Sequence, residues 1–346
     1  AVIGRSRNVS DRLAGGVEFL FKKNKVDYVR GFGSVVDNTH VEVKAEDGSV
    51  QTLETANIII ATGGRAREFP GLPFNGRSVI GSREAMTLPS QPSSMVIIGA
   101  GAIGVEFAYI YNAFGTEVTL VEMMPRLVPV EDDDIGDALK KSYSRQGIKC
   151  LTDTKVTATE DAGDSVRVTV EHARGSEVIE ADVCLVAIGV VPVLPGGQLP
   201  EFTDRGWIHI GDRYETSMNG VYAIGDIAGP PWLAHTAMYE ATQCVDGIFL
   251  PDETPQRVGT FPGCTYCYPE IASVGKTERE LKEEEVTYKV GKFPYQALGK
   301  AQAAAETEGF IKLLFGEEHG ELLGAHIIGA NATDIIAEMG LGLTLE

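Results

Sequence analysis

The sequence has little positive charge and no long apolar run. Thirty Lys and Arg residues stand against 49 Asp and Glu, which gives a formal net charge of −19 at pH 7. Such an acidic surface repels phosphate backbones and anionic lipid headgroups, so nucleic acid and membrane surfaces are excluded as general partners. The longest uncharged stretches, near residues 85–105 and 183–200, contain prolines and glycines, and neither is typical of a membrane span.

Cysteine and histidine are also scarce. The odd number and irregular spacing of the cysteines exclude an extracellular disulfide framework and favour a reducing cytoplasm. The five are Cys150, Cys184, Cys244, Cys264 and Cys267. The six histidines form no metal-spaced cluster, and Cys264 and Cys267 lack the second pair that a structural zinc ion needs, so we expect no metal site. We interpret these two cysteines as structural, with a regulatory disulfide between them as the alternative.

Glycine, in contrast, is abundant. The chain holds 40 glycines in 346 residues, where an average composition of about 7% would give roughly 24. Excess glycine in a globular protein indicates tight turns and close backbone approaches, as nucleotide sites need. At about 150 residues per domain, the length predicts two or three domains.

The pattern of apolar residues indicates an α/β fold. Strands and helices alternate before Pro255, which predicts parallel sheets with helices on their faces. After Pro255 short strands surround a helix at 277–284, as in a separate α+β domain. Among the earlier elements we expect helices at 10–24, 133–146 and 234–248, and a strand at 26–30.

The strongest motif is a GxGxxG turn that follows the apolar run MVII and opens a helix. Its residues are Gly99, Ala100, Gly101, Ala102, Ile103 and Gly104. A second strand ends in Glu122, 18 residues after Gly104, so the context of a dinucleotide-binding fingerprint is complete. The glycines allow the turn, the approach of a pyrophosphate and close helix packing, while Glu122 can accept hydrogen bonds from ribose hydroxyls. An acid there favours NAD over NADP, although Arg126 keeps NADP open.

Two further strand ends carry glycine and a small polar group. Thr62, Gly63 and Gly64 follow the apolar strand 57–60, and Asp226 follows VYAIG. In α/β sheets the carboxyl ends of strands bind ligands, and Asp226 could hold a hydroxylated chain such as a ribityl group. Residues 232–235 open a helix whose N-terminus could stabilise negative charge on a bound ring system.

Together these segments resemble the pyridine nucleotide–disulfide oxidoreductases. The resemblance is carried by ATGG (61–64), GAGAIGVEFAYIYNAFGTEVTLVE (99–122), LVAIG (185–189) and YAIGDIAGPPWLAH (222–235). Residues 15–26, 263–278 and 288–303 are most similar to the members that oxidise dihydrolipoamide. The resemblance implies two Rossmann-like three-layer nucleotide-binding domains, the first truncated, and a C-terminal α+β interface domain. It assigns 1–92 and 214–255 to FAD binding, 93–213 to NAD binding and 256–346 to a partial interface domain.

The resemblance also implies which residues hold the cofactors. FAD would contact Gly33, Thr62, Gly63, Gly64, Asp226, Trp232, Leu233, Ala234 and His235. NAD would contact the six residues of the glycine turn together with Val105, Glu106, Glu122, Val156 and Gly189, and Glu106 would lie toward the nicotinamide.

The implied activity is the oxidation of dihydrolipoamide with NAD, through FAD and a redox disulfide. The implied partners are a second copy of the chain and the lipoyl-bearing acyltransferase subunit of 2-oxo acid dehydrogenase complexes, in the cytoplasm. Alternatives are a mercuric reductase, a soluble transhydrogenase or, if these 346 residues are the whole protein, a non-catalytic nucleotide-binding protein.

Three features of the family are missing. The sequence contains no first GxGxxG for FAD, no redox Cys-x4-Cys and no His-x-His-Pro-Thr base segment. We therefore expect an internal fragment of a longer chain that holds no catalytic residue and is inactive alone.

Overall fold

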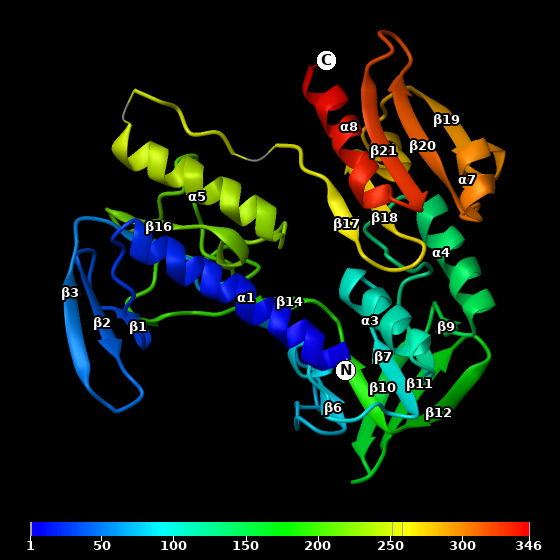
Figure 1. The fold of residues 1–346 in the computed structure, drawn as a ribbon, viewed down its shortest axis with the longest axis horizontal. Coiled ribbons are helices and arrows are strands. Elements are labelled where there is room, and N and C mark those ends of the chain that lie inside the picture. The colour runs from blue at the N-terminus through cyan, green and yellow to red at the C-terminus, as the bar shows by residue number, and fades with distance from the viewer. Residues whose placement is uncertain (1, 251, 258, 346) are drawn as a thin grey trace. The chain divides into compact units, whose positions relative to one another are not determined.

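The computed structural model describes residues 2–250, 252–257 and 259–345, and these form two units. Unit 1 is built from residues 1–65 and 190–259, and unit 2 from residues 66–189 and 260–346. Both units are assembled from segments far apart in the sequence. Figure 1 shows their helices and strands in chain order.

Unit 2 contains a five-stranded parallel sheet in the order β6-β13-β7-β8-β9. Its strands are β6 (Val79–Ile80), β7 (Ser94–Ile98), β8 (Glu117–Val121), β9 (Lys149–Leu151) and β13 (Val183–Val186). Residues 95–98 are all buried, as expected for a central parallel strand covered on both faces. Helices α2 (Ser82–Ala85), α3 (Ala102–Ala113) and α4 (Asp133–Gln146) connect these strands.

Two layers cover this sheet. On one face, apolar side chains of α3 and α4 such as Val105 and Leu139 pack on Ile97 and Leu120. On the other face lies a three-stranded antiparallel sheet, in which alternate residues such as Val168 are buried. This sheet consists of β10 (Lys155–Asp161), β11 (Val166–His172) and β12 (Gly175–Ala181). The result is a three-layer α/β arrangement, which confirms the predicted fold class for this part of the chain.

The C-terminal part of unit 2 is a five-stranded antiparallel sheet in the order β17-β18-β21-β20-β19. Its strands are β17 (Gly263–Thr265), β18 (Ile271–Gly275), β19 (Tyr288–Pro294), β20 (Gly309–Gly316) and β21 (Leu322–Gly329). The accompanying helices are α6 (Glu278–Glu283), η2 (Tyr295–Ala297), α7 (Gly299–Ala304) and α8 (Ala332–Leu345). Ile336 of α8 is buried with Val274 and Ile327, so this helix covers the sheet and completes an α+β domain.

Unit 1 holds smaller sheets. The first has the order β15-β1-β2-β3, and the other two are the pairs β16-β4, which is parallel, and β14-β5. The strands are β1 (Phe32–Val35), β2 (His40–Lys44), β3 (Val50–Glu54), β4 (Ile58–Ile60), β5 (Gly64–Ala66), β14 (Val190–Pro192), β15 (Gly196–Gly197) and β16 (Val221–Ala223). The helices are α1 (Val2–Lys23), η1 (Gly225–Ala228) and α5 (Ala234–Phe249).

Most predicted elements are confirmed, with one error. Helix α4 has the predicted bounds, and α5 extends one residue beyond its predicted end. The strand predicted at 26–30 was wrong, because these residues pair with no strand and follow a chain reversal at Lys25, where φ is 56°. Helix α1 begins eight residues before its predicted start, and none of its described side chains is buried.

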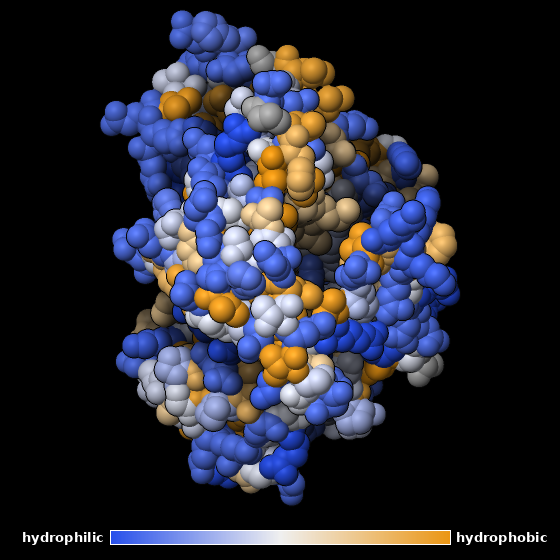
Figure 2. Space-filling view, turned by 90° about the vertical axis from the view of Figure 1, so that its left-hand side faces the viewer, coloured by the Kyte–Doolittle hydropathy of each residue, from blue (hydrophilic) through white to orange (hydrophobic). Residues whose placement is uncertain are grey.

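Apolar side chains also occur at the surface. Figure 2 shows them among hydrophilic side chains on the face drawn, as in ordinary globular proteins. Among the helices of the described residues, none combines the length and the apolar composition that crossing a membrane requires.

Candidate nucleotide-binding sites

The glycine turn joins β7 to α3 with almost no spare space. Gly99 has φ +97°, and a side chain there would overlap the carbonyl oxygen of Ala187. A side chain on Gly104 would overlap the carbonyl oxygen of Gly99, so only glycine lets α3 pack this closely on the turn. At Gly101 no neighbouring atom lies within 4 Å of the position that a Cβ atom would take. The turn thus meets the requirements for backbone approach by a pyrophosphate.

The first turn of α3 offers backbone donors to this space. The helix has 12 residues, and its N-cap Gly101 supplies no side-chain cap. The N–H groups at the start of a helix lack intrahelical acceptors, and the aligned peptide dipoles give this end a partial positive charge. Such a terminus binds phosphate readily.

Glu122 lies at the end of β8, beside the turn. Its Oε2 accepts the N–H of Ala100 at 2.7 Å, and its Oε1 accepts the N–H of Met124 at 2.8 Å. The residue is 8% exposed. These two bonds hold the carboxylate in place, and each oxygen retains a second lone pair that can accept a ribose hydroxyl.

A cavity of about 480 Å³ opens at this point. Five of the predicted NAD residues line it, namely Gly99, Gly101, Glu122, Val156 and Gly189. Its volume suits a cofactor pocket, and its lining is mainly apolar with few polar groups. The structure therefore gathers residues that are up to 90 positions apart in the sequence around one space.

Sequence reasoning missed several residues of this cavity. They are Phe69, Ile98, Val121, Met123, Pro129, Thr154, Lys155, Ala187 and Ile188. A few are neighbours of the predicted residues and could have been found from their place at strand ends. Phe69 and Pro129 come from connecting segments, and no local pattern points to them.

The remaining predicted NAD residues belong to the turn or to α3, and they do not line the cavity. Ala100 is fully buried and bonds Glu122 and Val128 through its backbone. Glu106, on α3, accepts the N–H of Tyr266 at 2.8 Å. Burial raises the pKa of Glu106, and the bond from Tyr266 opposes that rise only in part. The carboxylate of Glu106 thus lies beside the segment between β17 and β18.

Arg126, which left NADP as an alternative cofactor in the sequence analysis, pairs with two aspartates. Its guanidinium lies 3.3 Å from a carboxylate oxygen of Asp133 and 3.2 Å from one of Asp137, both on α4. Two carboxylates thus oppose its single charge. This guanidinium is therefore less available to a 2′-phosphate than the sequence indicated.

The residues predicted for FAD all lie in unit 1. Strands β4 and β16 pair in parallel, so Thr62 and Asp226 follow neighbouring strand ends. A side chain on Gly64 would lie 3.4 Å from a carboxylate oxygen of Asp226, and Gly63 has φ +74°. Burial raises the pKa of Asp226. Gly33 lies apart from these strands in β1, in the four-stranded sheet.

The start of α5 has the properties of a ligand-binding helix end. Its N-cap is Leu233, which supplies no capping side chain, and the helix runs for 16 residues. The hydroxyl of Thr236 is buried and has no hydrogen-bond partner among the described residues. Trp232 packs on Trp207 with ring centroids 5.3 Å apart. An orphaned buried hydroxyl beside free helix N–H groups fits the polar edge of a flavin.

The thiols of the chain form no disulfide. All five cysteines are free, so no disulfide joins Cys264 to Cys267. Burial raises the pKa of Cys267 to about 12 and that of Cys184 to about 12. Because the thiolate is the nucleophile, these environments suit structural cysteines rather than redox centres.

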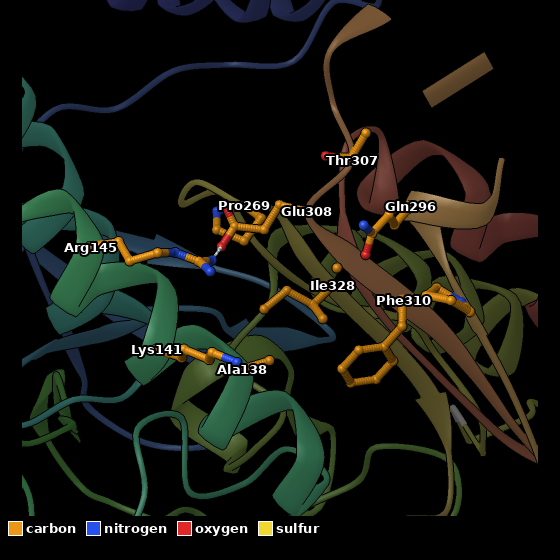
Figure 3. A pocket seen from close by; sticks show the side chains of 11 residues that line it. Ala138, Lys141, Arg145, Pro269, Gln296, Thr307, Glu308, Phe310 and Ile328 are labelled. Carbon is orange, nitrogen blue, oxygen red and sulfur yellow. Dashed lines mark hydrogen bonds and ion pairs between the residues drawn. The ribbon is translucent and has the colours of Figure 1, made fainter. Parts of the chain in front are cut away.

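A second cavity, of about 460 Å³, lies between α4 and the C-terminal sheet of unit 2. Figure 3 shows the ion pair of Arg145 with Glu308 at its edge and Ile328 and Phe310 beside it. None of the predicted cofactor residues lines this cavity.

Comparisons with known proteins agree with this geometry. The family model "Pyridine nucleotide-disulphide oxidoreductase" matches residues 2–241, and the model of that family's dimerisation domain matches residues 261–346. A dihydrolipoyl dehydrogenase of Rhizobium etli is 41% identical, covering 100% of this chain and 76% of the relative. Another, from Chlorobaculum parvum, is 41% identical over 99% of this chain and 75% of the relative.

Solved structures show the same fold at lower identity. LpdA from Mycobacterium tuberculosis has a TM-score of 0.90 at 22% identity, covering 99% of this chain and 76% of that one. The HOCl-induced flavoprotein disulfide reductase RclA from Escherichia coli has a TM-score of 0.83 at 23% identity, covering 96% and 78%.

The match to the dimerisation domain supports a homodimer. The matches to the two models together extend over nearly the whole chain. The dihydrolipoyl dehydrogenases among its relatives use FAD and NAD. The chain belongs to the pyridine nucleotide–disulphide oxidoreductase family.

Proposed function

We propose that this chain carries FAD- and NAD-binding residues of an enzyme that oxidises dihydrolipoamide with NAD. The dihydrolipoyl dehydrogenases among its relatives support this substrate. The observation that carries the proposal for NAD is the cavity of about 480 Å³ lined by Gly99, Gly101, Glu122, Val156 and Gly189.

Each group in the NAD cavity has a separate task under this proposal. The N–H groups of the first turn of α3 bind the pyrophosphate, and Gly101 leaves space for its approach. The carboxylate of Glu122 accepts the ribose hydroxyls and excludes a 2′-phosphate by charge repulsion.

In unit 1, Thr62, Gly63, Gly64, Asp226 and the start of α5 hold the flavin. Asp226 accepts hydroxyls of the ribityl chain, and the N–H groups at residues 234–236 stabilise negative charge on the ring system. When bound, the flavin supplies the hydride chemistry, and the protein orients it. The reaction also needs a redox disulfide. No two of the five cysteines in this sequence have the Cys-x4-Cys spacing of that disulfide.

The same proposal extends to partners and location. The protein reoxidises the lipoyl group of an acyltransferase subunit in a 2-oxo acid dehydrogenase complex, and acts as a homodimer. The five unpaired thiols are compatible with a reducing compartment, and we assign the cytoplasm.

Two assays on the 346-residue protein test the cofactor sites. Calorimetry should detect NAD binding at least tenfold tighter than NADP binding. With FAD added, NADH should reduce ferricyanide, because two electrons then pass through the flavin to two ferricyanide ions and no thiol is needed. Equal affinity for NAD and NADP would contradict the role of Glu122.

The substrate is tested separately on the protein isolated from cells that make it. Dihydrolipoamide with NAD should turn over at about 10 per second, the usual order for enzymes. Faster turnover of oxidised glutathione with NADPH would exclude dihydrolipoamide as the substrate. The 346-residue polypeptide should show no dihydrolipoamide oxidation, since its sequence has no Cys-x4-Cys.

A further inference from the structure

The wall of the NAD cavity includes a loop that connects β8 to α4. We call residues 123–131 the cavity loop. Met123 and Pro129 of this loop line the cavity, and the loop leads directly into Asp132, the N-cap of α4. Its position therefore decides how much room a nucleotide has beside Glu122.

On the cavity side, the loop is tied to the glycine turn. The N–H of Val128 donates to the carbonyl of Ala100 at 2.7 Å, and Val128 has the unusual φ of 45°. At the start of the loop, the N–H of Met124 donates to Glu122 at 2.8 Å. Both bonds join the loop to groups that belong to the cofactor site itself.

The far end of the loop is held by the C-terminal domain of unit 2. Arg279, on α6, donates to the carbonyl of Pro129 at 3.1 Å and to the carboxylate of Asp133 at 2.7 Å. The N–H of Glu278 donates to Asp132 at 3.1 Å. Helix α6 thus contacts the carbonyl of a residue that lines the cavity.

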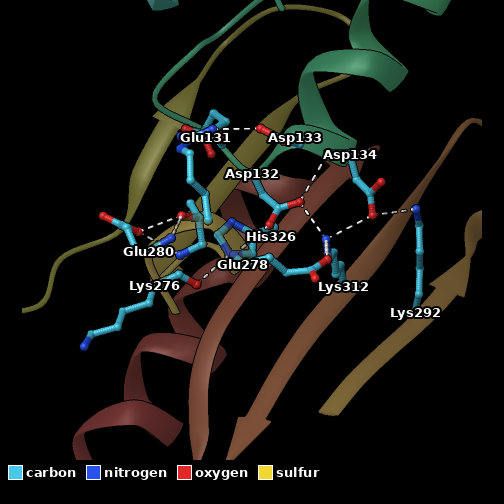
Figure 4. A network of polar contacts seen from close by, with 12 residues as sticks. Glu131, Asp132, Asp133, Asp134, Lys276, Glu278, Glu280, Lys292, Lys312 and His326 are labelled. Carbon is cyan, nitrogen blue, oxygen red and sulfur yellow. Dashed lines mark hydrogen bonds and ion pairs between the residues drawn. The ribbon is translucent and has the colours of Figure 1, made fainter. Parts of the chain in front are cut away.

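A buried lysine strengthens this attachment (Figure 4). Lys312, on β20, is 1% exposed and lies 2.6 Å from Asp132 and 3.0 Å from Asp134, and it also pairs with Glu278. Asp132 is 2% exposed. A charged pair so removed from water is held firmly, because breaking it would leave a charge buried without a partner.

We propose that Arg279 and Lys312 are positioning residues for NAD. They hold the cavity loop against the glycine turn, so that the pocket is formed before the nucleotide arrives. The inference rests on the proposed function, because it assumes that the cavity binds NAD. A loop that is already ordered loses no further conformational entropy when the nucleotide binds. The contacts that order the loop should therefore increase the affinity for NAD.

Loss of a tether should weaken NAD binding and leave FAD binding unchanged. Arg279 and Lys312 lie in unit 2, whereas the residues assigned to the flavin lie in unit 1. The loss of a tether should therefore raise the dissociation constant of NAD and the KM for NADH, while the FAD content and kcat stay unchanged. A purely structural role would lower the folded fraction and reduce all of these signals together.

Arg279→Ala is the first test, because Arg279 is 41% exposed and its removal leaves the core intact. NAD affinity is measured by calorimetry well below the melting temperature, with NADH–ferricyanide kinetics in parallel. We expect affinity to fall about threefold to tenfold, the worth of one or two hydrogen bonds. Lys282→Ala is the matched control: Lys282 is on the same helix and pairs with Glu278, and within the described part of the chain its side chain makes no bond to the cavity loop. Its affinity should equal that of the wild type.

The second test uses Lys312→Met combined with Asp132→Asn, which removes the buried charges as a pair and keeps a residue that can cap α4. We again expect a threefold to tenfold loss, with FAD content unchanged. If the wild type binds NAD and both Arg279→Ala and the double variant bind it with an affinity within twofold of the wild type, the positioning role is overturned and the proposed function stands. Wild-type protein that does not bind NAD would overturn the proposed function and this inference with it.

Discussion

Lys312→Met removes the ammonium group from a cluster of three carboxylates and keeps a side chain of similar length. Lys312 and Asp132 are almost fully buried, at 1% and 2% exposure, while Asp134 and Glu278 reach the surface. Because methionine fills nearly the same space, we expect no cavity, and the effect should be electrostatic.

The magnitude follows from what remains buried. Removing one partner of a buried ion pair destabilises a protein by about 3–5 kcal/mol. Asp132 keeps its bonds from the N–H groups of Asp134 and Glu278, and the other two carboxylates can be rehydrated. We therefore expect the low end, a loss of about 3 kcal/mol in the free energy of unfolding of unit 2.

A double variant separates charge from packing. Adding Asp132→Asn removes the most buried carboxylate, and asparagine still caps a helix well. The double variant should lose only about 1–2 kcal/mol, so the two changes should be strongly non-additive, as expected for groups in direct contact.

The pH dependence gives the sign of the interaction. Burial raises the pKa of Asp132, but the hydrogen bonds from Lys312 and from Glu278 outweigh it, so this pKa lies below its ordinary value. The stabilisation from such a group is complete above its unfolded pKa of about 4 and is lost as the pH falls through the lower folded value. The difference between wild type and Lys312→Met should thus be full at pH 7 and shrink below about pH 4.

Urea unfolding at pH 7 and below about pH 4 measures the free energy of unfolding of each variant. Both tryptophans, Trp207 and Trp232, lie in unit 1, so their fluorescence reports that unit, while far-UV circular dichroism reports both. The urea midpoint of the fluorescence transition should be the same in the wild type and the variant. The transition in the dichroism should show the lower stability of unit 2. A loss below about 1 kcal/mol at pH 7, or a double variant less stable than the single one, would refute the reasoning.

Three further changes probe the site and its surroundings. Gly104→Ala should weaken NAD binding at least about tenfold by calorimetry, because the new methyl group overlaps the turn, whereas Gly16→Ala on exposed α1 should leave it unchanged. Glu122→Ala should weaken NAD more than NADP, and an unchanged preference would remove Glu122 from the ribose site. Burial raises the pKa of Glu131 to about 7, so wild-type stability should fall from pH 5 to pH 8 as this carboxyl ionises. Glu131→Gln should reduce that fall in thermal melts.

Much of the proposed nucleotide site consists of neighbouring residues, and the sequence could predict it for that reason. The strand, the glycine turn and the helix from Ser94 to Ala113 are consecutive, and each glycine answers a backbone requirement that its neighbours impose. Glu122 ends the next strand of the same sheet, so its place beside the turn follows from βαβ geometry. The bounds of α4 likewise follow from Asp132 at its N-cap and Gly147 after its end.

The rest depends on contacts between distant segments. Lys312 occupies an inward position between Phe310 and Leu314 on β20, where its alternation predicts an apolar side chain. Its carboxylate partners, among them Asp132, 180 residues away, make that burial tolerable. Arg126 similarly looked available to a phosphate until α4 placed two aspartates beside it. Adjacent residues thus determine the backbone turns, whereas the charge pairs and the walls of the cavity form only when separate elements pack together.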